Sequence, residues 1–181
     1  MRQAQEITPP SYETIQEGLQ PLFFDNLNRI YCAKSHLLER LSEVVEFVAF
    51  ADLKFAMLGT LDELENQLSR MDELYQLLGL EYSFSSCSGI ISVFENAFSA
   101  IDLKHDNMVA RDLSIFCYLL KVESIELASF QMLEVLSGQL KDDRIKQILE
   151  ENFEESKADK ALMLMIATKY VRDIGMRVDA H

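Results

Sequence analysis

The sequence has few of the residues that interrupt or cross-link a fold. It contains no tryptophan, three prolines, six glycines and three cysteines in 181 residues. Because proline and glycine are the strongest breakers of regular structure, their scarcity permits long helices and disfavours architectures of many short strands. No apolar run reaches the roughly eighteen residues of a membrane span, and residues 1–10 lack the apolar core of a signal peptide. We therefore expect no transmembrane helix.

Basic residues are also in short supply. Lys and Arg number 17 against 30 Asp and Glu, which gives a formal net charge of −13. Such a balance repels the phosphates of nucleic acids and of anionic membranes, so neither is an expected partner. The apolar fraction of 49% argues against disorder, and a chain of this length can bury a continuous core. The composition therefore indicates an acidic globular domain.

The cysteines and histidines form no recognisable motif. Cys32, Cys87 and Cys117 are odd in number and far apart, so we predict small core residues without a disulfide, in a reducing cytoplasm. No Cys/His cluster has zinc spacing, and no phosphate-binding loop or nucleophile elbow occurs. The histidines are expected at the surface. They are His36, His105 and His181.

Apolar residues recur at steps of three and four along four long segments, which marks one face of each as the buried side of a helix. The segments cover residues 21–48, 51–78, 108–137 and 142–172. A shorter helix is expected at 89–103, in the long connection between the second and third. Long amphipathic helices of similar length pack as a bundle. The sequence therefore predicts an all-α, ferritin-like four-helix bundle with a short extra helix.

Several residues suit the ends of these helices. Pro21 fits a first helical turn, Gly79 a left-handed stop, and Asp106 or Asn107 an N-cap. Ser11 is a candidate cap for a short helix over 11–18, and Gly138 ends the third long segment. We expect an N-terminal arm over 1–19, the bundle over 20–175 and a C-terminal tail over 176–181.

Charged residues fall on or near the inward faces of the predicted helices. Lys34 and Glu123 lie within the apolar stripes of the first and third long segments. Further polar residues lie at the borders of the stripes: Glu63, Gln67, Glu126, Glu155 and Asp159. Lone buried carboxylates are costly, so carboxylates that converge inside a bundle need a cation. The alternative is that these side chains flank the stripe and reach solvent, which we favour for Gln67 and Asp159.

Short motifs in all four segments resemble one known family. The first has Leu27-Asn28-Arg29-Ile30-Tyr31-Cys32-Ala33, similar to "LxDIYDAE", and the second has Leu53-Lys54, Asp62-Glu63 and Gln67, similar to "LK…EET…Q". The third has Arg111-Asp112 and Val122-Glu123-Ser124-Ile125-Glu126-Leu127-Ala128, similar to "RD…VExxEIA". The fourth has Leu149-Glu150-Glu151 and Glu154-Glu155-Ser156-Lys157-Ala158, similar to "LLEET…EEKA". Over about residues 20 to 170, the chain resembles the YciF-like (YciE/YciF) group of ferritin-like proteins.

The resemblance implies a homodimer and a dinuclear iron site with glutamates from all four long helices. The expected glutamate of the first helix falls on Lys34, a histidine of the second on Thr60, and a glutamate of the fourth on Ser156. The ligand positions that remain are expected to be vestigial or weak. They are Glu63, Glu123, Glu126 and Glu155.

Three functions are compatible with this pattern. The first, which we favour, is a non-catalytic, stress-related or interaction protein that has lost its metal and needs no cofactor. The second is a di-iron ferroxidase or peroxide scavenger, and the third is a structural bundle with no inherited site. Lys34 distinguishes the first two, because its ammonium would replace the metal as counter-charge to Glu123 and to one or more of the other glutamates. Alternatively, its stem reaches outward to solvent.

Overall fold

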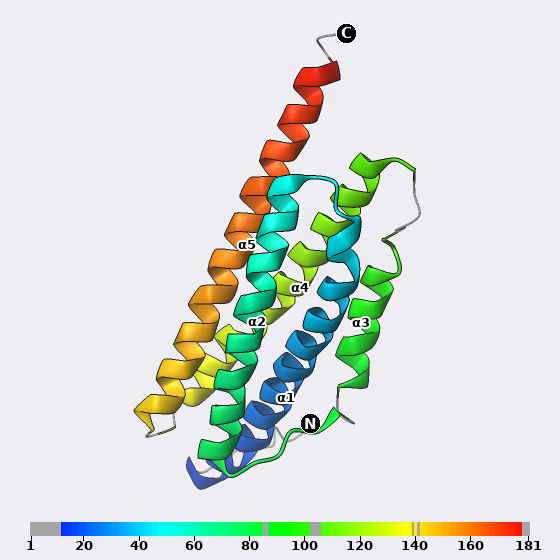
Figure 1. Cartoon of the computed structure of the whole chain (residues 1–181). Helices are drawn as coiled ribbons and strands as arrows, with labels where there is room; N and C mark the ends of the chain where they lie inside the picture. The colour runs from blue at the N-terminus through cyan, green and yellow to red at the C-terminus, as the bar shows by residue number, and fades with distance from the viewer. Residues whose placement is uncertain (1–11, 85–86, 102–105, 139, 141, 179–181) are drawn as a thin grey trace, which may run out of the picture.

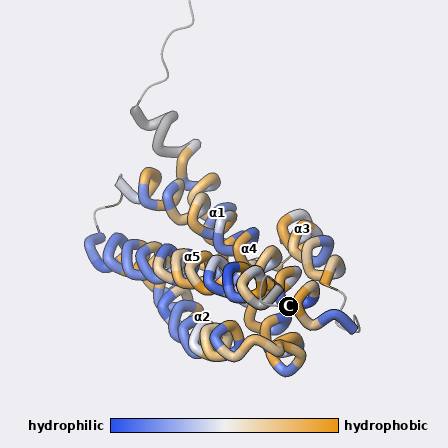
Figure 2. The backbone as a smooth tube through the Cα atoms, turned by 90° about the horizontal axis from the view of Figure 1, so that it is seen from above, coloured by the Kyte–Doolittle hydropathy of each residue, from blue (hydrophilic) through white to orange (hydrophobic). Residues whose placement is uncertain are grey.

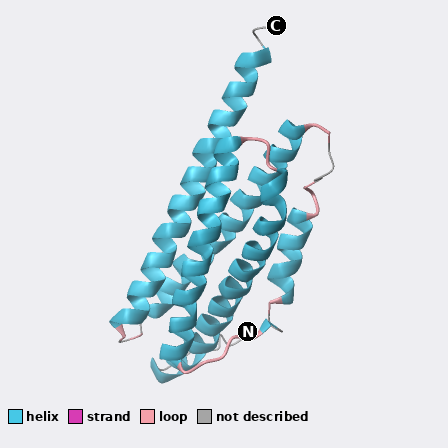
Figure 3. Ribbon diagram, viewed as in Figure 1, coloured by secondary structure: helices cyan, strands magenta, loops and turns pink. Residues whose placement is uncertain are grey.

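The fold is an all-α bundle with a short fifth helix on its outside (Figure 1). The computed structural model describes residues 12–84, 87–101, 106–138, 140 and 142–178, and these ranges contain no strand (Figure 3). The predicted four-helix bundle, with its extra helix in the long connection, is confirmed. The elements in order are α1 (Tyr12–Val44), the short 3-10 helix η1 (Val45–Phe47), α2 (Ala51–Leu78), α3 (Ser88–Phe98), α4 (Met108–Ser137) and α5 (Asp143–Val178).

The long helices form a closed ring of neighbours. Helix α4 packs against α5 and α1, and α2 packs against the same two helices. Seen from above, α3 lies on the outer side of this ring, beside α1 and α4 (Figure 2). None of the helices in the described ranges combines the length and the apolar composition that a membrane span needs.

The helix ends follow the predicted signals in part. Gly79 ends α2 with φ 65°, in the left-handed region, and the Asn107 side chain accepts hydrogen bonds from Val109 N at 3.0 Å and Ala110 N at 3.2 Å. The predicted start at Pro21 is wrong, because α1 begins at Tyr12 and continues through the proline. An interior proline removes one backbone hydrogen bond but need not end a helix. The proposed cap Ser11 lies outside the described residues.

A buried carboxylate missed by the sequence analysis fixes one end of the bundle. Asp112 of α4 accepts hydrogen bonds from Phe50 N at 2.8 Å and Ala49 N at 3.3 Å. These amides precede α2, whose first backbone N–H groups have no partner within the helix. Tyr170 of α5 lies 3.4 Å from the same carboxylate. The turn between α1 and α2 is therefore attached to α4 and α5.

Two apolar clusters build the core, with a polar layer between them. The first core cluster includes Leu37, Leu41, Met57 and Phe116, and the second includes Leu27, Met71, Phe130 and Ile148. Between them, the four long helices contribute buried polar side chains, and one from each helix meets at the Lys34 ammonium. We call these four the polar layer: Lys34, Gln67, Glu126 and Ser156.

Candidate functional site

Lys34 of α1 is the centre of the polar layer. Its side chain is 1% exposed, and Nζ lies 2.6 Å from Glu126 Oε2 of α4. The same ammonium donates hydrogen bonds to Gln67 Oε1 of α2 at 2.5 Å and to Ser156 Oγ of α5 at 3.3 Å. It also lies 5.4 Å from the centre of the Phe130 ring. An ammonium with three acceptors from three helices is fully satisfied, so it does not reach outward to solvent.

Glu126 and Glu123 extend the site along α4. Both are buried, and Glu126 Oε1 and Glu123 Oε2 have no hydrogen-bond partner among the described residues. Burial raises the pKa of Glu123 well above its usual range, and the nearby carboxylate of Glu126 raises it further. The ammonium of Lys34 opposes both effects without cancelling them. Glu126 thus makes the direct ion pair, and Glu123 is the carboxyl that tends to keep its proton.

The remaining predicted carboxylates divide into three environments. Glu63 is exposed, Glu155 is half-buried, and Asp159 is buried. Burial raises the pKa of Asp159 to about 8, and its hydrogen bond with Glu63 contributes to the rise. The prediction that Asp159 and Gln67 reach solvent is wrong, because both side chains are buried. Their sequence positions are one step from the apolar stripe, but the facing helices close over them.

A second ion pair, missed by the sequence analysis, lies beside the first. Arg70 ion-pairs with Glu155 and donates a hydrogen bond from Nε to Asn152 Oδ1 at 3.0 Å. Gln67 Nε2 donates to the same Glu155 carboxylate at 3.1 Å. Gln67 therefore joins the two pairs, with its carbonyl on Lys34 and its amide nitrogen on Glu155. The three-residue spacing between Gln67 and Arg70 was a signal that both share one helical face.

The side chains of this site do not fit a dinuclear iron centre. Two irons require a set of glutamate and histidine donors directed inward from the helices. Within the described part of the chain, no three His, Cys, Asp or Glu side chains gather in a way that could hold a metal ion. The positions of expected donors carry an ammonium at Lys34 and hydroxyls at Thr60 and Ser156, all buried. The Lys34 ammonium also lies directly against Glu126, where a metal would have to bind.

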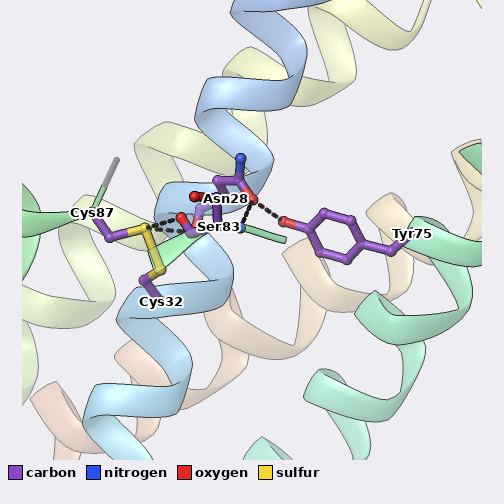
Figure 4. The surroundings of a disulfide bond; sticks show 5 residues. All are labelled: Asn28, Cys32, Tyr75, Ser83 and Cys87. Carbon is purple, nitrogen blue, oxygen red and sulfur yellow. Dashed lines mark hydrogen bonds between the residues drawn. A yellow bond between two sulfur atoms is a disulfide. The ribbon is translucent and has the colours of Figure 1, made fainter. Parts of the chain in front are cut away.

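Two of the cysteines form a disulfide, so the prediction of unpaired cysteines is wrong. Cys32 of α1 is joined to Cys87, the residue before α3, with 6.3 Å between their Cα atoms (Figure 4). Beside it, the Asn28 side chain accepts hydrogen bonds from Tyr75 Oη at 2.8 Å and Ser83 N at 3.2 Å. The pairing depends on α3 folding back along α1, which spacing alone does not reveal. Cys117 is unpaired and exposed instead of buried.

His36 is buried, so the prediction that it is a surface residue is also wrong. It stacks near Phe94 of α3, and burial lowers the pKa of its imidazole although Glu95 lies 3.5 Å away. A neutral ring therefore packs between α1 and α3. His105 and His181 lie outside the described residues.

Comparison with known proteins gives consistent matches along the chain. The model of DUF892, a domain of unknown function, matches residues 18–174. Protein YciF of Escherichia coli is 27% identical over 141 residues, which are 77% of this chain and 84% of that protein. The crystal structure of the Escherichia coli stress protein YciF gives a TM-score of 0.77 at 25% identity, over 85% of this chain and 97% of that one. YcfI from Rhodopseudomonas palustris gives a TM-score of 0.73 at 22% identity, over 90% and 97%, which is a likeness of fold alone.

Proposed function

The chain belongs to the DUF892 family, as its resemblance to YciF-like proteins predicted, and we propose that in this member the ammonium of Lys34 takes the place of a metal ion. The protein then acts as a non-catalytic, stress-related or interaction protein. The observation that carries this proposal is the position of Lys34 Nζ, 2.6 Å from Glu126 and inside the bundle.

The three departures from the family pattern support the proposal together. Lys34 and Ser156 stand where the family resemblance implies glutamates, and they face each other at 3.3 Å. A carboxylate at position 156 would form a second ion pair there, whereas a hydroxyl accepts one hydrogen bond without added charge. The shorter side chain at Ser156 therefore leaves room for the longer Lys34, and both substitutions remove negative charge that a metal would otherwise balance. Thr60, where the resemblance implies a histidine, adds a third buried group that is a poor iron ligand.

The protonation of the cluster also agrees with a single monovalent counter-charge. One ammonium balances one carboxylate, and Glu126 takes that place. The neighbouring carboxyls of Glu123 and Asp159 have raised pKa values, so they reduce their charge by keeping protons. A dinuclear metal centre would instead keep all of them ionised. In the metal-free protein, the buried carboxyls of this cluster are thus balanced by Lys34 and by retained protons.

Ferrous loading tests the proposal. We expect the purified protein, loaded with Fe²⁺ without oxygen and desalted, to retain well under two irons per chain by elemental analysis. The double variant Lys34→Glu/Ser156→Glu restores two carboxylates and should retain more iron than the wild type. Two tightly held irons in the wild-type chain, with an oxo-bridge absorbance after exposure to air, would show that the proposal is wrong.

The interaction role rests on an exposed apolar groove between α2 and α5. The groove has a volume of about 950 Å³, and its lining includes Phe55, Leu162 and Met165. Phe55 is 74% and Met165 63% exposed, which is unusual for side chains of this size. Next to the groove, the C-terminal end of α5 extends past the other helices (Figure 1). This face is thus an apolar surface that the bundle leaves uncovered.

We propose that a second copy of the chain covers this groove. Its rim carries charges of both signs, because Asp52 ion-pairs with Lys169 and Arg172 lies nearby. A two-fold axis places the same patch on both partners, so a patch with both signs can complement itself. The extended end of α5 also exposes the apolar side chains of Val171 and Met176, which a second copy could cover. Homodimer formation through α2 and α5 is therefore the interaction that we expect.

A further inference from the structure

The Cys32–Cys87 disulfide attaches the start of α3 to the middle of α1. Both sulfurs are buried, and the bond joins residues 55 positions apart in the sequence. Figure 4 shows the bond at the side of α1, next to Asn28 and Ser83. Lys34 follows Cys32 by two residues on the same helix. The disulfide therefore lies close in the chain to the buried ion pair.

The two ends of α3 are held in different ways. Near its C-terminal end, Phe94 is buried and Glu95 accepts hydrogen bonds from Arg40 Nε at 2.8 Å and Nη2 at 2.7 Å. At its N-terminal end, no side-chain hydrogen bond or ion pair links Ser88, Gly89 or Ile90 to another helix in the described part of the chain. The first turn of α3 is therefore attached by the disulfide and by Ile90, which is partly buried against the first core cluster.

Ile90, in that first turn, is part of the wall of a small cavity. The cavity has a volume of about 170 Å³ and lies where α1, α3 and α4 meet, with Ile30, Ala33, Ile125 and Glu126 among its lining residues. Glu126 is the carboxylate that pairs with Lys34, and its Oε1 has no hydrogen-bond partner among the described residues. The cavity therefore leads from the side of the bundle to the polar layer.

We propose that the Cys32–Cys87 disulfide is a redox-sensitive latch that controls access to the buried Lys34–Glu126 pair. A dithiol reductant opens it by thiol–disulfide exchange. One thiolate attacks Cys87 Sγ and displaces the Cys32 thiolate, and the second thiol then resolves the mixed disulfide. The reductant loses two electrons and two protons and becomes a disulfide, and Cys32 and Cys87 become thiols. Both sulfurs are buried, and we place the attack at Cys87 because Ser88 and Phe84 on its side are exposed, whereas Tyr31 and Ala33 beside Cys32 are buried.

Reduction then changes the position of one end of α3 only. Phe94 and the Arg40–Glu95 ion pair keep the C-terminal end in place. The first turn, which is no longer bonded to α1, moves outward with Ile90, and the cavity widens toward solvent. Segments with few anchoring contacts open locally at a lower free energy than the whole fold. The oxidised protein closes the polar layer, and the reduced protein exposes it.

Chemical labelling of Lys34 tests the latch. All proteins carry Cys117→Ser, so that the exposed thiol cannot exchange with the disulfide. The protein, either oxidised or reduced with dithiothreitol, is treated briefly with acetic anhydride. Acetylation of Lys34 is then measured by peptide mass spectrometry, relative to acetylation of the exposed Lys157. We expect reduction to raise the relative rate of Lys34 acetylation by about tenfold, as local opening predicts. In the Cys32→Ser/Cys87→Ser variant, Lys34 should be acetylated at this higher rate without reductant.

Two outcomes would overturn the proposal. The first is an equal rate of Lys34 acetylation in the oxidised and the reduced protein. The second comes from Leu74→Ala, which weakens the second core cluster with the disulfide intact. If this variant raises Lys34 acetylation as much as reduction does, unfolding of the whole bundle explains the labelling. The Ile90→Ala variant, in contrast, should raise the rate while the disulfide remains closed.

Discussion

The two oxygens of the Glu126 carboxylate are in different environments: Oε2 lies 2.6 Å from Lys34 Nζ, whereas Oε1 has no partner among the described side chains. Because both residues are 1% exposed, neither charge can be screened by water if the other is removed. Each charge of the pair, Lys34 on α1 and Glu126 on α4, therefore needs the other to be stable inside the bundle. Removing one of the two charges should destabilise the fold far more than removing both.

Lys34→Met should destabilise the protein strongly near neutral pH. Removing the ammonium leaves a buried carboxylate without counter-charge, which costs about 3–5 kcal/mol in free energy of unfolding. The loss should shrink on acidification, because a protonated carboxyl needs no counter-charge. Urea unfolding followed by circular dichroism at pH 7 and pH 4 measures both effects.

Two variants make this experiment decisive. Lys121→Met removes an exposed lysine of α4 and should change the free energy of unfolding little. The double variant Lys34→Met/Glu126→Gln removes both charges and should cost less than Lys34→Met alone. An unchanged unfolding midpoint for Lys34→Met at pH 7 would refute the importance of the pair.

Asp159 should make the protein less stable as the pH rises from about 4 to about 8. Its pKa is raised to about 8 by burial and by the hydrogen bond with Glu63, whereas an unfolded aspartate ionises near its ordinary value of about 4. Between these values the folded state binds the extra proton, so its stability falls with rising pH and levels off above the folded pKa. Asp159→Asn should remove the part of this pH dependence that comes from Asp159. At pH 8 the variant should therefore be more stable than the wild type.

The comparison requires urea unfolding of wild type and Asp159→Asn at several pH values in this window. Asp62→Asn, at an exposed position of α2, is the matched control and should keep the wild-type slope. Equal slopes for wild type and Asp159→Asn would mean that Asp159 is ionised in the folded protein at neutral pH.

Sequence periodicity predicted the helices because burial of an apolar stripe is a local pattern. The lengths of α2 and α4, the stop at Gly79 and the cap at Asn107 all follow from residues within one segment. These features need no knowledge of which helix lies opposite. The position of Lys34 inside the stripe left burial and outward reach both open, and the structure shows its side chain buried.

The features that the sequence did not predict depend on neighbours from distant segments. Gln67 is buried because α1 and α5 supply its partners Lys34 and Glu155. Cys32 meets Cys87 only because α3 returns along α1. Likewise, Asp112 caps the start of α2 from another helix. A spacing rule within one helix cannot predict such pairs, because the relative rotation of the helices decides them.

Reduction of the disulfide should lower the stability of the whole bundle. A cross-link between residues 55 positions apart restricts the unfolded chain, and loop entropy alone corresponds to about 4 kcal/mol. Urea unfolding with and without dithiothreitol should show a lower midpoint for the reduced protein. The Cys117→Ser variant should behave like the wild type in both conditions. Identical midpoints with and without reductant would show that the bond does not form in solution.

Met165→Glu should convert the proposed homodimer into a monomer. The side chain is 63% exposed in the groove between α2 and α5, so a carboxylate there adds no strain to the isolated chain. In the dimer the charge would be buried against the partner without a counter-charge, which disfavours association strongly. Light scattering coupled to size-exclusion chromatography measures the change in mass. Val135→Glu is the matched control, because Val135 is 73% exposed on α4 and does not line the groove. A dimer that persists in Met165→Glu, or a wild type that is monomeric at all concentrations, would exclude this interface.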